Sequence, residues 1–225
     1  MVLVNYLHNE TAALDVVARC QKLGGDAFAV RADVRDATQV QAMMAQILSE
    51  AGHLDGVVNN AFAPYVFDPE QRRRFWETDW SHYQAQFEGA VQAAYNVCQA
   101  VLPHFKQRVQ GSIVNMVSDL VERPTVPYHD YATAKSALVG FSRQLAAELG
   151  PLNIRVNCVA PGLVWPTDAS RATSESVKDQ IIAQTPLGRI ATPDDVAGPV
   201  LFLLSNWSRF VTGQVLTVDG GLVMR

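Results

Sequence analysis

The chain has 225 residues, of which 48% are hydrophobic and 18% are charged. This supply of apolar residues is enough for one large hydrophobic core, and nothing in the composition requires a second domain. The 18 Lys and Arg residues and 22 Asp and Glu residues give a net charge of −4, which leaves no cationic excess for binding nucleic acid or an anionic membrane. We therefore expect one domain, residues 1–225, and small neutral or anionic substrates remain open.

Short β-rich runs alternate with longer helical patterns along the chain. Apolar runs predict strands at 2–4, 27–31, 54–59, 112–117, 154–159 and 214–218. Helical periodicity predicts helices at 10–23, 38–51, 79–101, 130–149 and 193–204, and Pro103 is expected to stop the third of them. Because strands that are apolar almost throughout are covered on both faces, the alternation predicts an α/β fold, a parallel sheet with helices on both faces.

Two long segments, 62–78 and 162–185, carry no predicted helix or strand. Long loops in a compact α/β domain are usually lids or binding loops. We therefore expect these two loops to grip a substrate above the rigid sheet.

The first six residues are too few, and too soon followed by polar residues, to form a signal peptide or a membrane span. Cys20, Cys98 and Cys158 lie far apart and lack the short spacings of metal sites. We expect buried thiols in a reducing compartment, no metal site, and a cytoplasmic location.

Tyr131 and Lys135 are four residues apart, which places both side chains on one face of the predicted helix. An unperturbed tyrosine titrates near ~10, and a neighbouring cation lowers that pKa. The alternative is an amphipathic helix with a half-buried tyrosine and a lysine that reaches water. Ser118 favours the first interpretation, because it ends an apolar strand and the carboxyl edge of a parallel sheet is where ligands bind.

Five motifs along nearly the whole chain resemble the short-chain dehydrogenase/reductase family, and within it most closely the 3-oxoacyl-acyl-carrier-protein reductase group. Ser118, Tyr131 and Lys135 keep the family's catalytic spacing. The other motifs are Asn-Asn-Ala at 59–61, Arg-Val-Asn-Cys-Val-Ala-Pro-Gly at 155–162, Pro-Leu-Gly-Arg at 186–189 and Thr-Val-Asp-Gly-Gly at 217–221. The resemblance implies a Rossmann-like doubly wound sheet and hydride transfer between a nicotinamide cofactor and a carbonyl or alcohol.

The resemblance also implies a role for each catalytic residue. Tyr131 would donate a proton to the substrate oxygen in reduction and accept it in oxidation. Lys135 would lower the pKa of Tyr131 and hold the nicotinamide ribose. Ser118 would hydrogen-bond the substrate oxygen as charge develops.

The cofactor contacts that the resemblance implies lie at strand ends and turns. They are Asn5, Asp33, Val34, Asn59, Ala61, Tyr131, Lys135, Pro161, Gly162, Val164 and Thr167. The alternative is that strand ends and turns favour Asp, Asn, Pro and Gly in any α/β protein. Because no carboxylate follows the first strand before Glu10, we expect NADP(H) to be favoured over NAD(H).

The family begins with a strand and a glycine-rich turn that cradles the cofactor pyrophosphate. This sequence shows no such segment, and Met1 stands where the family's second strand begins. The absent strand is central in the family's sheet, so its loss would leave backbone groups unpaired on two buried strands, at about 1–3 kcal/mol per group. We therefore expect an N-terminally incomplete domain or a gap filled by other means, and a chain extended upstream is expected to bind cofactor and melt higher.

The family places an asparagine of a proton relay inside the long helix. Alignment from the Leu-Pro pair at 102–103 puts Ala90 at that position, and alignment from Trp80 puts Phe87 there. The helix is therefore expected to carry an insertion. The relay ends at water unless one of three amide side chains replaces the asparagine, namely Gln86, Gln92 or Asn96.

Phe62 replaces the glycine that normally closes the Asn-Asn-Ala motif, and it either crowds the cofactor and lines the substrate pocket or packs beneath the loop at 62–78. Tyr128 and Trp165 are the other candidate pocket residues. Relatives of this kind are commonly tetramers, so we expect a homotetramer or a dimer. The apolar stripe of the long helix is compatible with an interface or with the core.

Two functions follow from these expectations. The first is an NADP(H)-dependent reductase of carbonyl substrates, including acyl thioesters. The second is a non-catalytic relative that binds a nucleotide or a partner through the same fold. The intact catalytic trio favours the first.

Overall fold

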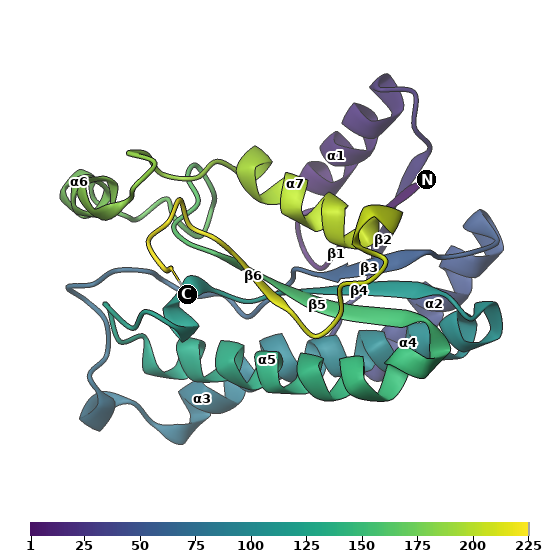
Figure 1. Ribbon diagram of the computed structural model, residues 1–225, viewed down its shortest axis with the longest axis horizontal. Helices are drawn as coiled ribbons and strands as arrows, with labels where there is room; N and C mark the ends of the chain where they lie inside the picture. The colour runs from purple at the N-terminus through teal and green to yellow at the C-terminus, as the bar shows by residue number, and fades with distance from the viewer. Residues whose placement is uncertain (225) are drawn as a thin grey trace.

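The computed structural model describes residues 1–224 and confirms the α/β fold (Figure 1). The strands are β1 (Val2–Tyr6), β2 (Ala27–Arg31), β3 (Gly56–Asn59), β4 (Gly111–Met116), β5 (Ile154–Pro161) and β6 (Val215–Val218). The helices are α1 (Glu10–Lys22), α2 (Ala37–Ala51), α3 (Trp80–Phe87), α4 (Ala93–Arg108), α5 (His129–Leu149), α6 (Glu175–Gln184) and α7 (Pro193–Leu204). Among the residues described, no helix is both long and apolar enough to cross a membrane.

All strand pairs are parallel, but the strands form two sheets, β1-β2 and β3-β4-β5-β6. The Val2 amide donates to the Asp26 carbonyl and the Tyr6 carbonyl accepts from the Ala32 amide, so both groups face β2. Since backbone groups alternate sides along a strand, those of Leu3 and Asn5 face the other edge of β1. Within residues 1–224, no strand pairs with that edge or with the second edge of β3.

The two free edges are less buried than the sequence predicted. Val2 is exposed, and every other residue of β1 and β3 is only half-buried. Solvent therefore reaches these backbone groups. Leaving one of them unpaired costs less free energy of folding than leaving unpaired a fully buried group, as was expected from the sequence.

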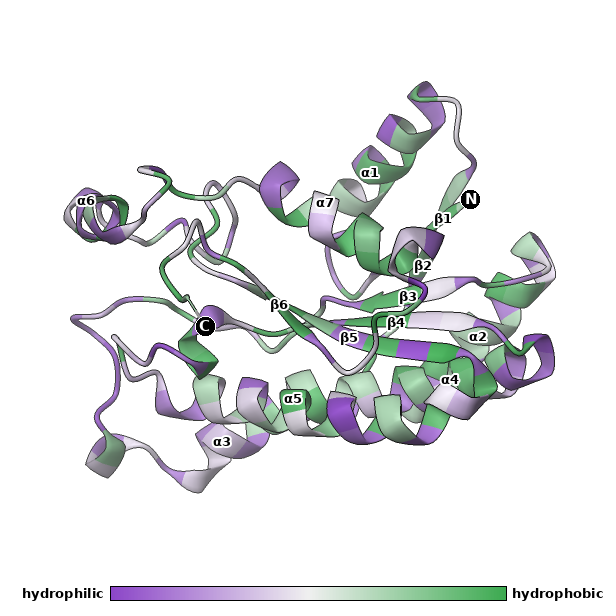
Figure 2. Cartoon of the chain, in the orientation of Figure 1, coloured by the Kyte–Doolittle hydropathy of each residue, from purple (hydrophilic) through white to green (hydrophobic). Residues whose placement is uncertain are grey.

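Helices cover both faces of the larger sheet (Figure 1). Helices α4 and α5 lie on one face and α7 lies on the other, so β4 and β5 are sealed on both sides and are almost wholly buried. Hydrophobic residues accordingly follow the central strands and the inward faces of the helices in Figure 2. Phe105, Ile113 and Ile154 are fully buried at the centre of the largest core cluster. This rigid sheet positions the loops at its carboxyl edge.

The expected stop at Pro103 is wrong, because α4 continues through it to Arg108. The proline ring lies on the exposed face of the helix. Two residues later, the helix buries the whole side chain of Phe105. This burial offsets the hydrogen bond that the proline removes.

A π-helical segment, Glu88–Gln92, lies between α3 and α4, in the part of the long helix where the sequence predicts an insertion. π-helical turns occur frequently at functional sites. Gly89 in this segment packs against the loop at 62–78, because a β-carbon on it would lie 2.5 Å from the Ala63 side chain. The segment therefore brings the long helix and the loop into close contact.

The expected loop at 162–185 is partly wrong, because it contains helix α6. Only Lys178 of that helix is buried, and its short apolar stripe, Val177, Ile181 and Ile182, is half-buried. In the other loop, 62–78, the only helical element is one short 3-10 turn, Phe75–Glu77.

Candidate active site

The structure brings Ser118, Tyr131 and Lys135 together at the carboxyl edge of β4. Ser118 follows the strand and caps a short 3-10 helix, Asp119–Val121, where its Oγ accepts from the Leu120 amide at 3.3 Å. Tyr131 lies in the first turn of α5 and Lys135 one turn later. The three residues are 6%, 8% and 4% exposed, so the expected half-buried tyrosine and solvated lysine do not describe this site.

The electrostatics of Tyr131 differ from the expectation. Burial raises the pKa of Tyr131 to about 12, although its hydrogen bond with Ser118 acts in the lowering direction. Lys135 Nζ donates to the Met116 carbonyl at 2.8 Å and lies 5.7 Å from the centre of the Tyr131 ring. Burial also lowers the pKa of Lys135 to about 8, which reduces its charge at neutral and alkaline pH. The buried phenol is therefore a proton donor at neutral pH in this state.

Aromatic side chains of the loop at 62–78 cover Tyr131. The Tyr65 and Phe67 rings lie 5.1 and 5.0 Å from the Tyr131 ring, measured between centroids. The Tyr65 hydroxyl donates to Asp130 Oδ1 at 2.8 Å, and the same oxygen accepts from the Tyr131 amide. The expected lid therefore lies closed over the phenol. Tyr65 and Phe67 were not among the site residues predicted from the sequence.

Phe62 lies in the site and not beneath the loop. Lys135 Nζ is 5.3 Å from the centre of its ring, and the ring meets the Tyr131 ring edge-on at 6.2 Å. Both are ordinary distances for cation-π and aromatic contacts. The ring thus covers the ammonium group expected to hold the cofactor ribose.

The other two candidate pocket residues differ in their exposure and in their neighbours. Tyr128 is only 5% exposed, and its ring packs edge-on against the Tyr65 ring. Trp165 is 43% exposed, and Lys178 Nζ of α6 lies 4.3 Å above its ring. Tyr128 therefore supports the aromatic cover, whereas Trp165 is accessible to a substrate.

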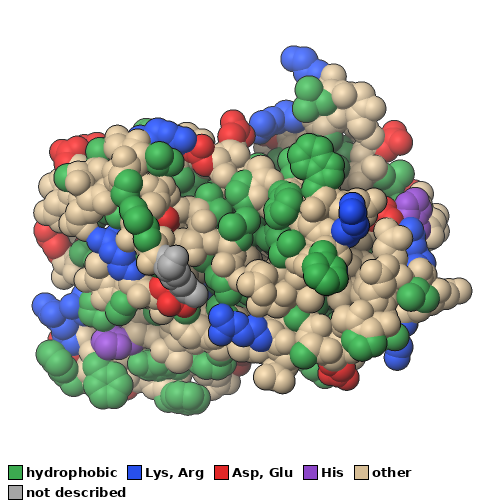
Figure 3. All heavy atoms as spheres, viewed as in Figure 1, with side chains coloured by type: hydrophobic (Ala, Val, Ile, Leu, Met, Phe, Trp, Pro, Cys, Tyr) green, Lys and Arg blue, Asp and Glu red, His purple; other side chains and the backbone are tan. Residues whose placement is uncertain are grey.

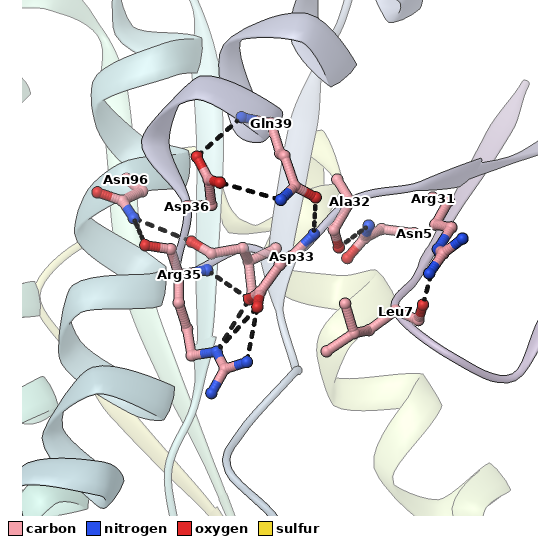
Figure 4. Close-up of polar contacts among 10 residues, drawn as sticks. Asn5, Leu7, Arg31, Ala32, Asp33, Arg35, Asp36, Gln39 and Asn96 are labelled. Carbon is pink, nitrogen blue, oxygen red and sulfur yellow. Dashed lines mark hydrogen bonds and ion pairs between the residues drawn. The ribbon is translucent and has the colours of Figure 1, made fainter.

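The residues at the carboxyl ends of β1 and β2 form a local polar network (Figure 4). Arg35 closes on the carboxylate of Asp33, with its Nη2 2.6 Å from Oδ2, and this contact lowers the pKa of Asp33. The Asn5 amide donates to the carbonyls of Val30 and Ala32. Asn5 and Asp33 are thus placed by contacts within the chain at the edge expected to hold the adenosine.

Asn96 does not replace the relay asparagine. Its Nδ2 donates to the carbonyls of Val34 and Arg35, at 3.0 and 2.9 Å, which ties α4 to the end of β2 (Figure 4). Of the other two amides, Gln86 is buried on α3 and Gln92 is exposed. Ala90, one of the two aligned positions, is buried in the π-helical segment.

Asn59 belongs to a hydrogen-bonded chain inside the sheet. Its amide donates to Asn115 Oδ1 at 2.8 Å, and the Asn115 amide donates to Ser142 Oγ at 2.7 Å. The side chain of Asn59 therefore links β3 to β4 and α5, and Ala61 is the exposed end of this motif.

The turn after β5 is tightly packed. A β-carbon on Gly162 would lie 3.0 Å from Asp219 Cβ and 3.3 Å from Asp119 Oδ2, so only glycine fits without a shift. Pro161 ends β5 just before it, and Val164 forms a bridge with Ala191. These contacts hold the turn at the same edge as Ser118.

Thr167 lies further along the same loop, after the turn. Its amide and hydroxyl both contact Ser170 Oγ, at 3.0 and 2.8 Å. Thr167, which is one of the expected cofactor residues, is therefore held by contacts within its own loop.

Sequence comparison places the chain among reductases. Residues 1–223 match the family described as enoyl-(acyl carrier protein) reductase. The chain is 38% identical over 220 residues to the 3-oxoacyl-(acyl-carrier-protein) reductase of Chlamydia muridarum, covering 97% of this chain and 84% of that protein. It is 32% identical over 223 residues to the enzyme of the same name from Staphylococcus aureus strain Mu50, covering 99% and 88%.

Solved structures agree with the sequence matches. A gluconate 5-dehydrogenase from Burkholderia cenocepacia, in complex with NADP and tartrate, superposes with a TM-score of 0.86 at 31% identity, covering 98% of this chain and 84% of that one. A 7α-hydroxysteroid dehydrogenase complexed with NADH and a 7-oxo bile acid conjugate superposes with a TM-score of 0.88 at 31% identity, covering 100% and 85%.

Proposed function

The chain belongs to the short-chain dehydrogenase/reductase family of oxidoreductases, and from this we propose that it reduces the carbonyl group of 3-oxoacyl thioesters with NADP(H). The observation that carries the proposal is the buried Ser118, Tyr131 and Lys135 at the carboxyl edge of the sheet. The substrate class is supported by the relatives' names, and NADP(H) by one solved neighbour and by the lack of a carboxylate at the end of β1.

Tyr131 and Ser118 have different roles in the proposed reaction: Tyr131 transfers a proton, and Ser118 stabilises the developing charge. A bound reduced nicotinamide supplies the hydride to the carbonyl carbon. Tyr131 donates its phenol proton to the carbonyl oxygen, and its raised pKa keeps that proton in place at neutral pH. Ser118 donates a hydrogen bond to the same oxygen as it gains charge. Lys135 would hold the ribose hydroxyls, because its ammonium group has further N–H donors besides the one that bonds the Met116 carbonyl.

The described residues fit the two ends of the cofactor better than its middle. Lys135 and the turn at Gly162 lie beside Tyr131 for the nicotinamide end, and the ends of β1 and β2 carry polar groups for the adenosine end. Between residues 1 and 224, no glycine-rich turn joins a strand to a helix N-terminus, the arrangement that holds a pyrophosphate. We propose that cofactor binding by these residues alone is weak.

The test is to incubate the protein with NADPH and acetoacetyl thioesters or simple ketones, and to follow the loss of NADPH absorbance. We expect oxidation of NADPH with the thioester and a lower rate with Ser118→Ala. NADPH binding without oxidation of NADPH by any carbonyl compound would contradict the proposal.

A non-catalytic nucleotide-binding function is the second candidate, and the observation in its favour is the closed cover over Tyr131 and Lys135. In that case Tyr131→Phe would leave every measured property unchanged. The same assay therefore separates the two functions.

We predict that Phe62→Ala tightens NADPH binding about 2- to 30-fold, the equivalent of the roughly 0.5–2 kcal/mol of a cation-π contact. The reason is that the cofactor ribose and the Phe62 ring compete for Lys135. Fluorescence titration with NADPH measures the affinity. The matched control is Phe75→Ala, which removes the same atoms from an exposed ring of the same loop. Equal affinities for both variants would contradict the competition.

We propose that the protein is a cytoplasmic homo-oligomer. Large exposed hydrophobic side chains gather over α7 and the segment after it on the face seen in Figure 3, and they include Leu201, Trp207 and Phe210. Such a patch is unusual on a monomer. The molar mass from light scattering at micromolar concentration tests this proposal.

A further inference from the structure

Asp119 is a buried carboxyl group that the proposed mechanism does not use. It follows Ser118 directly and is 7% exposed. Its Oδ1 lies 3.4 Å from Ser118 Oγ, and its Oδ2 faces the close turn at Gly162. Nothing in the sequence analysis singled it out, although an acidic residue next to the expected catalytic serine was visible there.

The Ser118 hydroxyl has only one proton to donate. Its oxygen already accepts from the Leu120 amide. The proton can therefore go to Asp119 Oδ1, which lies within reach, or to the Tyr131 hydroxyl, with which Ser118 is also hydrogen-bonded. A carboxylate is the stronger acceptor of the two.

We propose that Asp119 is a positioning residue that controls where the Ser118 hydroxyl points. The ionised carboxylate draws the Ser118 proton away from the substrate oxygen. The neutral carboxyl group accepts more weakly and can itself donate to Ser118 Oγ, which leaves the serine proton for the substrate. This inference rests on the proposed reductase function.

The charges around Asp119 place this switch close to neutral pH. Burial raises the pKa of Asp119 to about 6, and Asp219, which follows β6, acts in the same direction. Ser118 and Arg123 act in the lowering direction. Tyr131 faces Asp119 from α5, and the negative charge of Asp119 raises the pKa of the phenol.

The sign of the pH dependence follows. Below about pH 6 Asp119 is neutral and Ser118 is free to assist reduction, whereas above it the carboxylate captures the serine proton. The kcat for carbonyl reduction is therefore expected to fall several-fold as the pH rises through this range. The negative charge of ionised Asp119 also raises the pKa of Tyr131, so the phenol loses its proton at a higher pH.

Asp119→Asn tests the proposal, because the amide has the same size and does not ionise. We expect its kcat to stay flat through the range around pH 6. We also expect the pKa of the Tyr131 phenol, measured by ultraviolet difference absorbance against Tyr131→Phe, to fall, because the negative charge of Asp119 raises it. Asp55→Asn is the matched control, since it removes an exposed carboxylate just before β3, at the opposite end of the strands from Ser118, and it should keep the wild-type profile.

A wild-type pH profile in Asp119→Asn would overturn the proposal. If that variant does not fold, Ser118→Ala tests the proposal instead. The change of kcat near pH 6 must disappear in Ser118→Ala, because the serine hydroxyl that responds to Asp119 has been removed. A change of kcat that persists in this variant would overturn the proposal. If the wild-type protein oxidises no NADPH, the proposed function fails. The phenol titration still decides then, because an unshifted phenol pKa in Asp119→Asn refutes the coupling.

Discussion

Tyr131→Phe is expected to slow NADPH-dependent carbonyl reduction by about 10²–10⁴-fold, the usual contribution of a positioned general acid. The change removes one oxygen and keeps the ring that packs between Phe62, Tyr65 and Phe67. Stability and cofactor affinity should therefore change little, and the loss should fall on kcat. Steady-state kinetics with NADPH and the best substrate of the panel measure it.

Tyr95→Phe is the matched control for this prediction. It makes the same change on α4, where the Tyr95 side chain is 48% exposed. We expect wild-type kinetics from it. A Tyr131→Phe variant as active as the Tyr95→Phe variant would show that the phenol takes no part in the reaction.

The fold was predictable because hydrophobic periodicity reports which side of an element is buried. The strands around the core residues Ile113 and Ile154 are mostly apolar, and their positions were predicted within two residues. Helix α6 was missed, because its apolar pattern is limited to Val177, Ile181 and Ile182, which are only half-buried. The predicted helix end at Pro103 was wrong, because the burial of Phe105 two residues later outweighs the local rule that proline ends a helix.

The catalytic trio was predictable from spacing, but its electrostatic environment was not. The pKa of Tyr131 depends on how deeply the loop at 62–78 buries it, and no sequence pattern reports where that loop folds. The approach of Asp119 to Asp219 is similar. These two residues are 100 positions apart and meet only because β4, β5 and β6 end at one edge.

The division of the sheet has the largest consequence for stability. Leu3 and Asn5 on β1, and Gly56 and Val58 on β3, turn backbone groups toward edges that no strand within residues 1–224 occupies. A free edge is an aggregation risk as well as a loss of hydrogen bonds. The polar network at Asn5 and Asp33 lies on the smaller sheet, whereas Tyr131 packs on the larger one. The relative position of the two cofactor-binding ends thus depends on the seam, which is the junction between the free edges of β1 and β3.

Joining an apolar strand and a crossover helix ahead of Met1 is expected to raise the melting temperature by about 10 °C. The strand would run parallel to β1 and β3 and pair with both, and each new hydrogen bond contributes about 0.5–1.5 kcal/mol. For a chain of this size, each kcal/mol raises the melting temperature by roughly 2–4 °C. Thermal unfolding followed by circular dichroism measures the effect.

The control carries the same extension with two prolines in the strand, which lack the amide hydrogens needed for pairing. It should melt like the original chain, because its strand cannot complete the ladder. Equal melting of the two extended proteins would mean that the seam between β1 and β3 does not accept a strand. A rise only with the pairing strand, accompanied by tighter NADPH binding, would show that closing the seam also fixes the nicotinamide and adenosine ends of the site relative to each other.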